Sequence, residues 1–553
     1  MRISHYYILF AVMLSFCLGV RKNFRRRRAI LPLVIDREPI MEGKAWDAKP
    51  RSVNMNFFRV PLDHYNSRDN RTFLLRYATN FQFSEMENSP IIMALAGEWP
   101  IYSTYLENSR VYELARALGA HMLYVEHRYY GLSQPTSDTA IENLRYLTVE
   151  QSLADAASLI KYVKNSDGRR NSKVVVLGSS YSGALATWLR MKYPDLVNGA
   201  VSSSGPLLAK SDFYEYLEDI TETLLMLGGQ SCIDSIRSAI QEIKRLLTVK
   251  GGPKILTDLF KTCTPIKPQR PLDIQTFFWI IIGKFTALQY STDKKIVATC
   301  SILSNAENGS PLERLALFTG QKVGNNCYIT EYKTIVKEYK ATSYGLENVS
   351  GRLWYYQMCS TFGFFRTTSS QYQAFGDILP ITYFEKHFCP DIYGKRLNKN
   401  SLAKGIRKLN QAYGGLRPNV TNVAFISGRN DPWRQLSVLK DLSDSSPAMV
   451  ISGEGHCSNT RASKVDDSLP LVEAKDRILD LISKWTSDEP KWRVSSRMYS
   501  PQEGYRHYQD ENQLLKNVHH FDQRAFDDGY YSRSNTYDDY HDSDSYESDE
   551  YSY

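Results

Sequence analysis

The sequence lacks several features that would assign its class directly. None of its eight cysteines forms a Cys-x-x-Cys pair, so neither a zinc ribbon nor a thioredoxin-type redox site is expected. It contains no internal repeat. Its N-terminal apolar run, Tyr6 to Val20, is shorter than the roughly 20 residues that cross a membrane as a helix. The sequence therefore predicts no stable membrane span.

The composition is that of a globular protein with a sizeable core. Of 553 residues, 42% are hydrophobic and 23% are charged, which excludes a fully disordered or collagen-like chain. The net charge of +8 is unevenly distributed: residues 501–553 carry 13 acidic and 4 basic side chains, and seven basic residues lie in the first 28 positions. The rest of the chain lacks the basic footprint of a nucleic-acid-binding protein.

The N-terminus predicts entry into the secretory pathway. Residues 1–20 combine Arg2, the apolar run and the small residues Cys17 and Gly19, as a signal peptide does, with an uncleaved anchor as the alternative. The basic segment 21–50 could be a propeptide. Its cluster Arg25–Arg28 fits either a proprotein-convertase site or a solvated terminus with no role.

Cysteines and glycosylation signals indicate the same compartment. Six of the seven cysteines outside the signal fall within about 160 residues, consistent with three disulfides in one subdomain. Four asparagines lie in N-glycosylation sequons: Asn70, Asn308, Asn348 and Asn419. We therefore expect an extracellular or lysosomal protein.

The C-terminal segment 491–553 is predicted to be a disordered acidic tail. From about Pro501 it alternates Tyr, Ser, Asp and Glu without apolar periodicity, and residues 501–553 contain nine tyrosines. The tail fits tyrosine sulfation, adhesion or a solvated end without a specific partner.

The body alternates strand and helix patterns and is then interrupted. Short apolar runs at 91–96, 120–126, 174–177 and 197–203 alternate with helical patterns at 105–118, 148–164 and 183–193, which predicts a βαβ sheet. Thr148 and Gln151 are expected to form a capping box. Helical patterns at 214–227, 232–247 and 274–288 follow, and strand patterns return at 423–427 and 448–452, before a helix at 469–485. We predict a core of residues 51–206 and 411–490 with a helical insertion at 207–410.

Ser180 is the candidate nucleophile. It lies in Gly178-Ser-Ser180-Tyr-Ser-Gly183, where a predicted strand meets a predicted helix. Such a tight turn needs small neighbours and presents its central hydroxyl above the sheet. The Tyr181 amide, at the helix N-terminus, could donate to an oxyanion. Ser182 departs from the usual Gly-x-Ser-x-Gly pattern, and the alternative is an ordinary Ser/Gly-rich turn.

His456 and Asp431 complete a candidate triad. In hydrolases on such sheets the order is Ser, then Asp or Glu, then His, which leaves only His387 and His456 outside the tail. His456 follows a strand in a Gly-rich loop, whereas His387 lies in the cysteine-rich insertion. Asp431 follows the preceding strand and would orient the imidazole.

The ordered motifs resemble the prolylcarboxypeptidase family of serine peptidases, which includes the lysosomal dipeptidyl peptidase and thymus-specific serine protease. The resemblance runs from about Phe57 to Trp485, and details around Asp431 and His456 look closest to the thymus-specific branch. It is carried by these motifs: Gly97-Glu98, Val125-Glu-His-Arg-Tyr-Tyr-Gly131, Leu147-Thr-Val-Glu-Gln-Ser-Leu-Ala-Asp155, Gly178-Ser-Ser-Tyr-Ser-Gly183, Gln357-Met-Cys-Ser, Asp431-Pro-Trp433 and Gly455-His456-Cys457.

The resemblance implies an α/β-hydrolase sheet with a disulfide-rich helical cap and cleavage after proline. Trp433 would be a wall of the proline pocket, Gly97 would belong to the oxyanion loop, and Glu98 could receive a substrate's free amine. It also implies the disulfides Cys232–Cys300, Cys263–Cys327 and Cys359–Cys389, with Cys457 free near the base.

Some residues depart from the family pattern. Ala96 and Trp99 stand where glycines are usual, and a bulky Trp99 could narrow the cleft or reshape the oxyanion loop. Thr361 and Asn459 replace acidic residues outside the triad. For Glu126, His127 and Arg128 we expect a buried polar network that supports the sheet.

The leading hypothesis is a serine peptidase that acts on peptides and needs no cofactor. The sequence leaves carboxypeptidase, dipeptidyl peptidase and endopeptidase modes open, and it allows a homodimer. The alternatives are an esterase, which the absence of a long apolar run in the cap disfavours, and a secreted binding or adhesion protein on a hydrolase fold.

Overall fold

A computed structural model describes residues 29–30, 52–84, 86–165, 169–320 and 326–487. The predicted signal peptide, the acidic tail from 491 and all but two residues of segment 21–50 lie outside these residues. The described residues belong to one unit that ends at Pro490.

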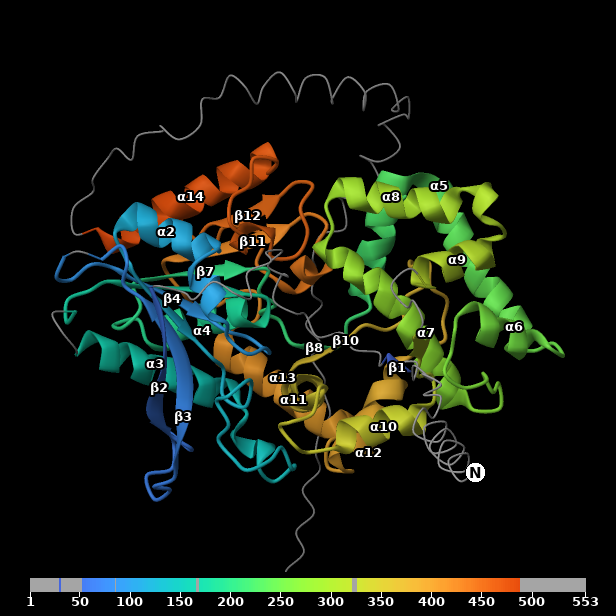
Figure 1. Ribbon diagram of the computed structural model, residues 1–553, viewed down its shortest axis with the longest axis horizontal. Helices are drawn as coiled ribbons and strands as arrows, with labels where there is room; N and C mark the ends of the chain where they lie inside the picture. The colour runs from blue at the N-terminus through green and yellow to red at the C-terminus, as the bar shows by residue number, and fades with distance from the viewer. Residues whose placement is uncertain (1–28, 31–51, 85, 166–168, 321–325, 488–553) are drawn as a thin grey trace, which may run out of the picture. The chain divides into compact units, whose positions relative to one another are not determined.

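The fold is built around an eight-stranded mixed sheet with the order β12-β11-β7-β6-β4-β5-β3-β2 (Figure 1). The strands from β12 to β5 are parallel to their neighbours, whereas β3 and β2 are antiparallel additions at one edge. The strands are β2 Val53–Pro61, β3 Thr72–Asn80, β4 Ile91–Leu95, β5 His121–Val125, β6 Val174–Ser179, β7 Gly199–Ser203, β11 Val423–Gly428 and β12 Ala448–Ile451.

Side chains alternate along the central strands, so both faces of the sheet are buried. In β4, Ile91 and Met93 join the larger core, whereas Ile92 and Ala94 join the smaller one on the opposite face. Helices α3 and α4 pack on the first face, and α2 and α14 pack on the second (Figure 1). These helices are α2 Arg110–Leu118, α3 Val149–Lys164, α4 Tyr181–Lys192 and α14 Leu469–Thr486.

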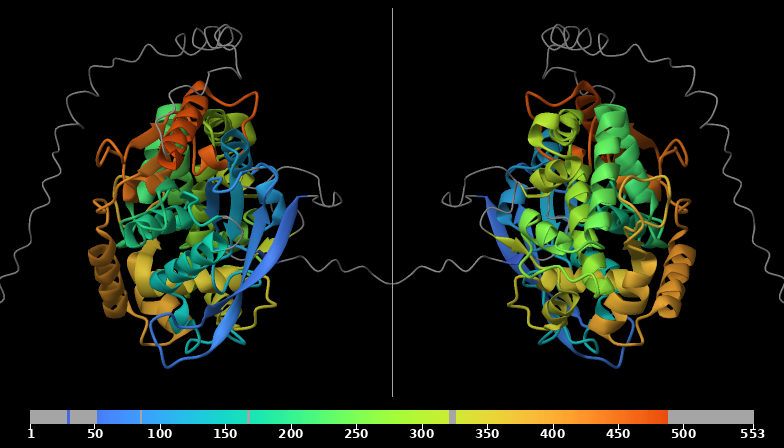
Figure 2. Two further views of the ribbon diagram at one scale, coloured as in Figure 1. Left: turned by 90° about the vertical axis from the view of Figure 1, so that its left-hand side faces the viewer. Right: turned by 90° about the vertical axis from the view of Figure 1, so that its right-hand side faces the viewer.

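The helical insertion leaves the sheet after β7 and returns at β11. Its helices lie beside the sheet in Figure 1, and in Figure 2 they lie behind the sheet in the left view and in front of it in the right view. They are α5 Glu215–Leu246, α6 Gly252–Leu259, α7 Pro271–Thr286, α8 Asp293–Ser304, α9 Pro311–Gly320, α10 Tyr332–Lys340, α11 Val349–Gln357, α12 Cys389–Tyr393 and α13 Lys399–Tyr413. Two short parallel pairs accompany them: β8 Lys210–Asp212 with β10 Gly363–Phe365, and β1 Ala29–Ile30 with β9 Cys327–Tyr328.

Three disulfides lie in the insertion, in the pairs that the resemblance implied. They are Cys232–Cys300, Cys263–Cys327 and Cys359–Cys389, and Cys457 is free and buried. The α/β-hydrolase sheet and its disulfide-rich helical cap are therefore both present.

Local expectations differ from the structure at several points. The helix expected at 105–118 begins only at Arg110, because the Ser109 side chain caps it there. The helices expected at 214–227 and 232–247 are joined as α5 across a kink at Gly229, whose φ is 76°. Thr148 does cap α3, but the Gln151 side chain bonds Asp63 instead of closing a capping box.

None of the helices in the described part of the chain combines the length and the apolar character that crossing a membrane requires.

Candidate active site

Ser180 occupies a sharp turn between β6 and α4. Its backbone has φ 55° and ψ −129°, a strained conformation for a residue with a side chain. Its N–H donates to the Ser203 carbonyl at 2.8 Å, which ties the turn to the end of β7. The strain and the position at a strand–helix junction are those of a nucleophile elbow.

Small residues around Ser180 permit this turn. A Cβ on Gly178 would lie 1.9 Å from the Ser182 carbonyl oxygen, and one on Gly183 would lie 2.9 Å from the Ser203 oxygen. Ser182, which departs from the usual pattern, is buried, and its hydroxyl both accepts from the Ser179 N–H and donates to the Ser179 carbonyl at 2.9 Å. The substitution therefore adds two hydrogen bonds to the elbow.

Asp431 holds His456 from the loop after β11. Its Oδ2 lies 2.9 Å from Nδ1 of His456, and its Oδ1 accepts the Trp433 N–H at 3.0 Å. Both the carboxylate and the imidazole are buried. Because Asp431 is fixed by the turn that follows it, it also fixes the orientation of the imidazole ring.

His456 is positioned by both the sheet and the cap. Its backbone N–H donates to the carbonyl of Gln289, in the cap, at 2.5 Å. The next residue, Cys457, donates its N–H to the Ser204 hydroxyl, and its Sγ lies 3.8 Å from the Ser203 carbonyl that also accepts from Ser180. Ser203 therefore joins the nucleophile turn to the loop of the base.

The electrostatic environment favours the charged form of His456. Burial by itself disfavours the imidazolium, but the Asp431 carboxylate and the neighbouring Cys457 outweigh it and hold the pKa of His456 well above its ordinary value. Among the described residues, nothing hydrogen-bonds to Nε2 of His456 or to the Ser180 hydroxyl, so both atoms are available for proton transfer.

Tyr181 and Gly97 lie where the oxyanion residues were expected. Tyr181 is the first residue of α4, so its N–H has no partner four residues earlier within the helix. Gly97 follows β4, which neighbours β6 in the sheet. Trp99 packs into the smaller core with its indole N–H donating to the Tyr124 hydroxyl at 3.0 Å, so it does not narrow the cleft. The Trp99 ring packs closely against the loop at Gly97, because a Cβ added to Gly97 would lie 3.0 Å from the nearest ring carbons.

An aromatic pocket opens beside the base. Trp433 connects the two: its ring lines the pocket, and its centroid lies 6.2 Å from that of His456. Its indole N–H donates to the Gln289 side chain at 2.8 Å. The other lining residues are Trp279, Ile282, Gly283, Thr286, Trp354, Tyr355, Met358, Phe364, Phe365, Arg366 and Phe384.

Glu98 lies near the buried phenols of Tyr130 and Tyr181. It is 1% exposed. Burial, and then the Glu98 carboxylate, hold the pKa of Tyr130 well above its ordinary value, and the same two causes act on Tyr181. Gln357 bridges the two phenols, because it accepts from Tyr130 at 2.7 Å and donates to Tyr181 at 3.1 Å.

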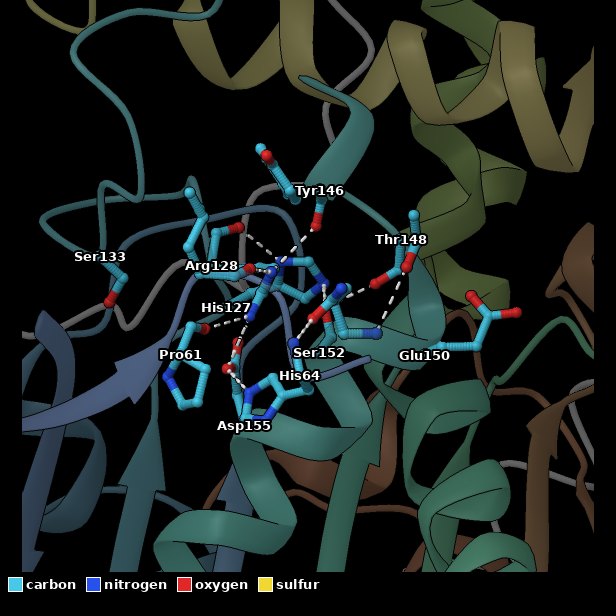
Figure 3. Close-up of polar contacts among 12 residues, drawn as sticks. Pro61, His64, His127, Arg128, Ser133, Tyr146, Thr148, Glu150, Ser152 and Asp155 are labelled. Atoms are coloured by element: carbon cyan, nitrogen blue, oxygen red, sulfur yellow. Dashed lines mark hydrogen bonds and ion pairs between the residues drawn. The ribbon is translucent and has the colours of Figure 1, made fainter. Parts of the chain in front are cut away.

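Arg128 organises a second buried network, drawn in Figure 3. Its guanidinium donates to both oxygens of Asp155 at 2.7 and 2.8 Å, and Asp155 also contacts His64 at 2.7 Å. His127 contacts the Ser152 hydroxyl at 2.7 Å. These groups link α3 to the sheet, which is the supporting role expected of this motif.

Glu126 completes that support from the end of β5. Its carboxylate is buried and accepts hydrogen bonds from the backbone N–H groups of Ile101, Leu132 and Ser133. It therefore fixes two loops and does not face the triad.

The four sequon asparagines differ in exposure. Asn70 and Asn419 are exposed, and Asn308 is half-buried. Asn348 is buried, and its amide donates to the Glu338 carbonyl at 2.8 Å. A glycan on Asn348 would have to break that bond.

Two glutamines of the site had no assigned role from sequence. Gln357 stands in one of the motifs that carry the family resemblance, but the motif by itself did not indicate what the residue does. Gln289 lies just beyond a predicted helix and in no motif, so nothing in the sequence marked it.

The sheet and its helical cap define an α/β-hydrolase fold. Comparison with known proteins assigns the chain to a class of serine peptidases. The chain belongs to the serine carboxypeptidase S28 family, whose profile matches residues 60–478. It is 31% identical to thymus-specific serine protease of Mus musculus (78% of this chain, 87% of that protein) and 28% identical to lysosomal Pro-X carboxypeptidase of Bos taurus (79% and 88%). Among solved structures it is similar to an esterase of Pyrobaculum calidifontis, with 11% identity and a TM-score of 0.31 over 78% of this chain and 86% of that one.

Proposed function

We propose that the protein is a secreted or lysosomal peptidase that cleaves after proline through Ser180, His456 and Asp431. The proposal rests on one observation. The serine with a strained, positive φ lies at the carboxyl ends of the parallel strands, and so does the buried Asp–His pair, whose atoms are 2.9 Å apart. The Ser203 carbonyl, which contacts both loops, supports their closeness.

In this mechanism, Nε2 of His456 takes the proton of Ser180 as Oγ attacks the carbonyl carbon of the scissile bond. Asp431 keeps Nδ1 protonated and stabilises the imidazolium. The proton then passes to the leaving amine, the C–N bond breaks, and an acyl ester remains on Ser180. Water, deprotonated by His456, hydrolyses that ester and restores the hydroxyl.

The N–H groups of Tyr181 and Gly97 would bind the negative oxygen of the tetrahedral intermediate. Both belong to loops at the carboxyl ends of adjacent parallel strands. The positive end of the α4 dipole also favours negative charge at this point.

The aromatic pocket supports a preference for proline. Trp433, Trp354 and Phe364 offer flat apolar surfaces, which suit a rigid ring that has no N–H to satisfy. The name of the bovine relative, lysosomal Pro-X carboxypeptidase, supports the same preference and an acidic compartment. The three cap disulfides support passage through an oxidising compartment.

Two exopeptidase modes follow from which end of the substrate is held. A carboxypeptidase would release one residue from the C-terminus. A dipeptidyl peptidase would need a carboxylate for the free amine, for which Glu98 is our candidate. Because Glu98 is 1% exposed, that mode requires the amine to reach it past the Tyr130 and Tyr181 phenols.

The test offers Xaa-Pro-Xaa peptides with free or blocked ends to the secreted protein at acidic and neutral pH, with products read by mass. A fluorophosphonate probe reports the reactivity of Ser180 separately. We expect cleavage after proline that Ser180→Ala abolishes and that Ser67→Ala, at an exposed serine, leaves unchanged. Blocking each end in turn identifies the exopeptidase mode.

Three results would contradict the proposal. Probe labelling with hydrolysis of simple esters but not of peptides would indicate an esterase. Neither labelling nor hydrolysis would indicate a binding protein. Cleavage that persists in Ser180→Ala would remove Ser180 from the mechanism.

A further inference from the structure

Arg366 is a cation in the wall of the aromatic pocket. It follows β10 directly, and its guanidinium carbon lies 4.3 Å from the Tyr216 ring centroid and 4.9 Å from that of Trp433. Stacking against two rings holds the planar guanidinium in place and leaves its N–H edge free to donate.

This guanidinium has no counter-ion in the described part of the chain. No Asp or Glu oxygen there lies within 4.0 Å of it, and its N–H groups make no hydrogen bond to a described residue. Nearby carboxylates are engaged elsewhere: Asp212 accepts from the Thr367 hydroxyl, and Asp219 pairs with Arg434 at 2.6 Å.

Two arginines of the interior have protein acceptors. Arg128 pairs with Asp155, and Arg352 donates to the carbonyls of Thr139 and Tyr339. A half-buried guanidinium among aromatic rings without such acceptors is costly unless water or a ligand supplies them. Arg366 differs from these arginines because it has no protein acceptor, so its N–H groups can bind an acceptor from a ligand.

Arg366 lies within reach of a substrate bound at the triad. The Trp433 ring centroid is 4.9 Å from its guanidinium carbon and 6.2 Å from the His456 ring, so the guanidinium and the imidazole are at most about 11 Å apart. An extended peptide advances about 3.3–3.6 Å per residue. A group one to three residues from the scissile bond, or the end of a long side chain beside it, can span that distance.

We propose that Arg366 is a specificity-determining residue that binds a carboxylate of the peptide substrate. The carboxylate is either an acidic side chain that enters the pocket or the free C-terminus just beyond the scissile bond. Both present the planar pair of oxygens that a guanidinium binds with two parallel hydrogen bonds. The inference rests on the proposed peptidase function and adds the substrate's charge to it.

The experiment compares matched peptides that differ only in one carboxylate. One pair ends in a free carboxylate or an amide, and a second, amidated pair carries Glu or Gln at the residue that follows the proline. Values of kcat and KM are measured for the wild type, for Arg366→Gln, for Arg366→Lys and for Arg417→Gln, an exposed arginine outside the pocket.

We expect the wild type to favour the charged member of one pair by at least tenfold in kcat/KM, mainly through KM. Arg366→Gln should bring that ratio close to one, Arg366→Lys should restore part of it, and Arg417→Gln should leave it unchanged. The pair that responds identifies the source of the carboxylate. Fluorophosphonate labelling of Ser180 in each variant verifies that the triad is assembled.

Two outcomes would overturn the inference in different ways. Hydrolysis by a labelled wild type with no preference for the charged peptides, or a preference that Arg366→Gln retains, would remove Arg366 from recognition and leave the peptidase function standing. No labelling and no hydrolysis in the wild type would remove the proposed function and this inference with it.

Discussion

The backbone carbonyl of Gln289 accepts the backbone N–H of His456 at 2.5 Å, so a residue of the cap holds the base of the hydrolase core. The same glutamine binds the pocket wall through its side chain. Its Oε1 accepts from the Trp433 indole at 2.8 Å and from the Tyr216 hydroxyl at 2.6 Å. Base, pocket wall and cap therefore form one connected unit.

Gln289→Leu should destabilise this unit while keeping its volume. The change leaves the buried Trp433 N–H without its acceptor and the Tyr216 hydroxyl with only the Thr286 carbonyl at 3.2 Å, at a cost of about 1–3 kcal/mol. Urea unfolding measures the loss, and we expect kcat/KM to fall with it. The exposed Gln230→Leu, on α5, should stay within about 0.5 kcal/mol of the wild type. Equal stabilities of the two variants would contradict the role of Gln289.

Asp431→Asn should lower kcat/KM by about 10⁴, because the imidazole loses its orienting acceptor. It should also move the acidic limb of the residual pH profile to lower pH. The Asp431 carboxylate opposes the effect of burial on the pKa of His456, so its removal lowers that pKa. Asp466→Asn, at an exposed aspartate, is the matched control. If the acidic limb of the pH profile stays at the wild-type pH in Asp431→Asn, the pKa of His456 does not determine that limb.

The neutral form of His127 should make the fold sensitive to acid. Burial lowers the pKa of His127 to about 4, from an ordinary value of 6.5. Between these values the unfolded chain binds a proton that the folded chain refuses. The neutral His127 therefore contributes about 3 kcal/mol to the free energy of unfolding. This contribution is complete above about pH 6.5 and is lost as the pH falls toward 4.

Unfolding free energies measured from pH 7 to pH 4 test this expectation. His127→Gln should show a shallower fall with pH than the wild type, even if it is less stable at pH 7. His387→Gln, at an exposed histidine, should keep the wild-type slope. A slope unchanged by His127→Gln would assign the acid sensitivity to other groups.

Glycosylation should follow exposure. In protein secreted from eukaryotic cells we expect glycans on the exposed Asn70 and Asn419, and none on Asn348, whose buried amide binds the Glu338 carbonyl. Enzymatic release of glycans in heavy-oxygen water, followed by peptide mass measurement, marks each occupied asparagine. A glycan on Asn348 in folded protein would contradict the expectation.

Local patterns were sufficient to predict the parallel strands of the sheet and to select candidates for a triad. Strand and helix periodicity located β4 to β7, β11 and β12, and the order of Ser180, Asp431 and His456 along these strands selected them. Such features depend on residues close in sequence or on the known order of parallel strands. The antiparallel strands β2 and β3 were missed, because their signal lies in pairing with each other.

Contacts between the cap and the core could not be predicted in the same way. Gln289, Gln357 and Arg366 act across segments that are far apart in the chain, and of these three only Gln357 stands in a recognised motif. The position of Trp99 depended on packing as well: only the core beneath α2 reveals that its ring points away from the cleft.

The separation of β7 from β11 has a consequence for biogenesis. These strands are neighbours in the sheet, yet about 220 residues lie between them. A ribosome must therefore synthesise the whole helical insertion before β7 can gain that partner. Until then the edge of β7 is exposed in a nascent chain that also carries unpaired cysteines. We therefore expect the yield of folded protein to rise with chaperones that shield this edge, and to be limited at this step in a host without an oxidising compartment.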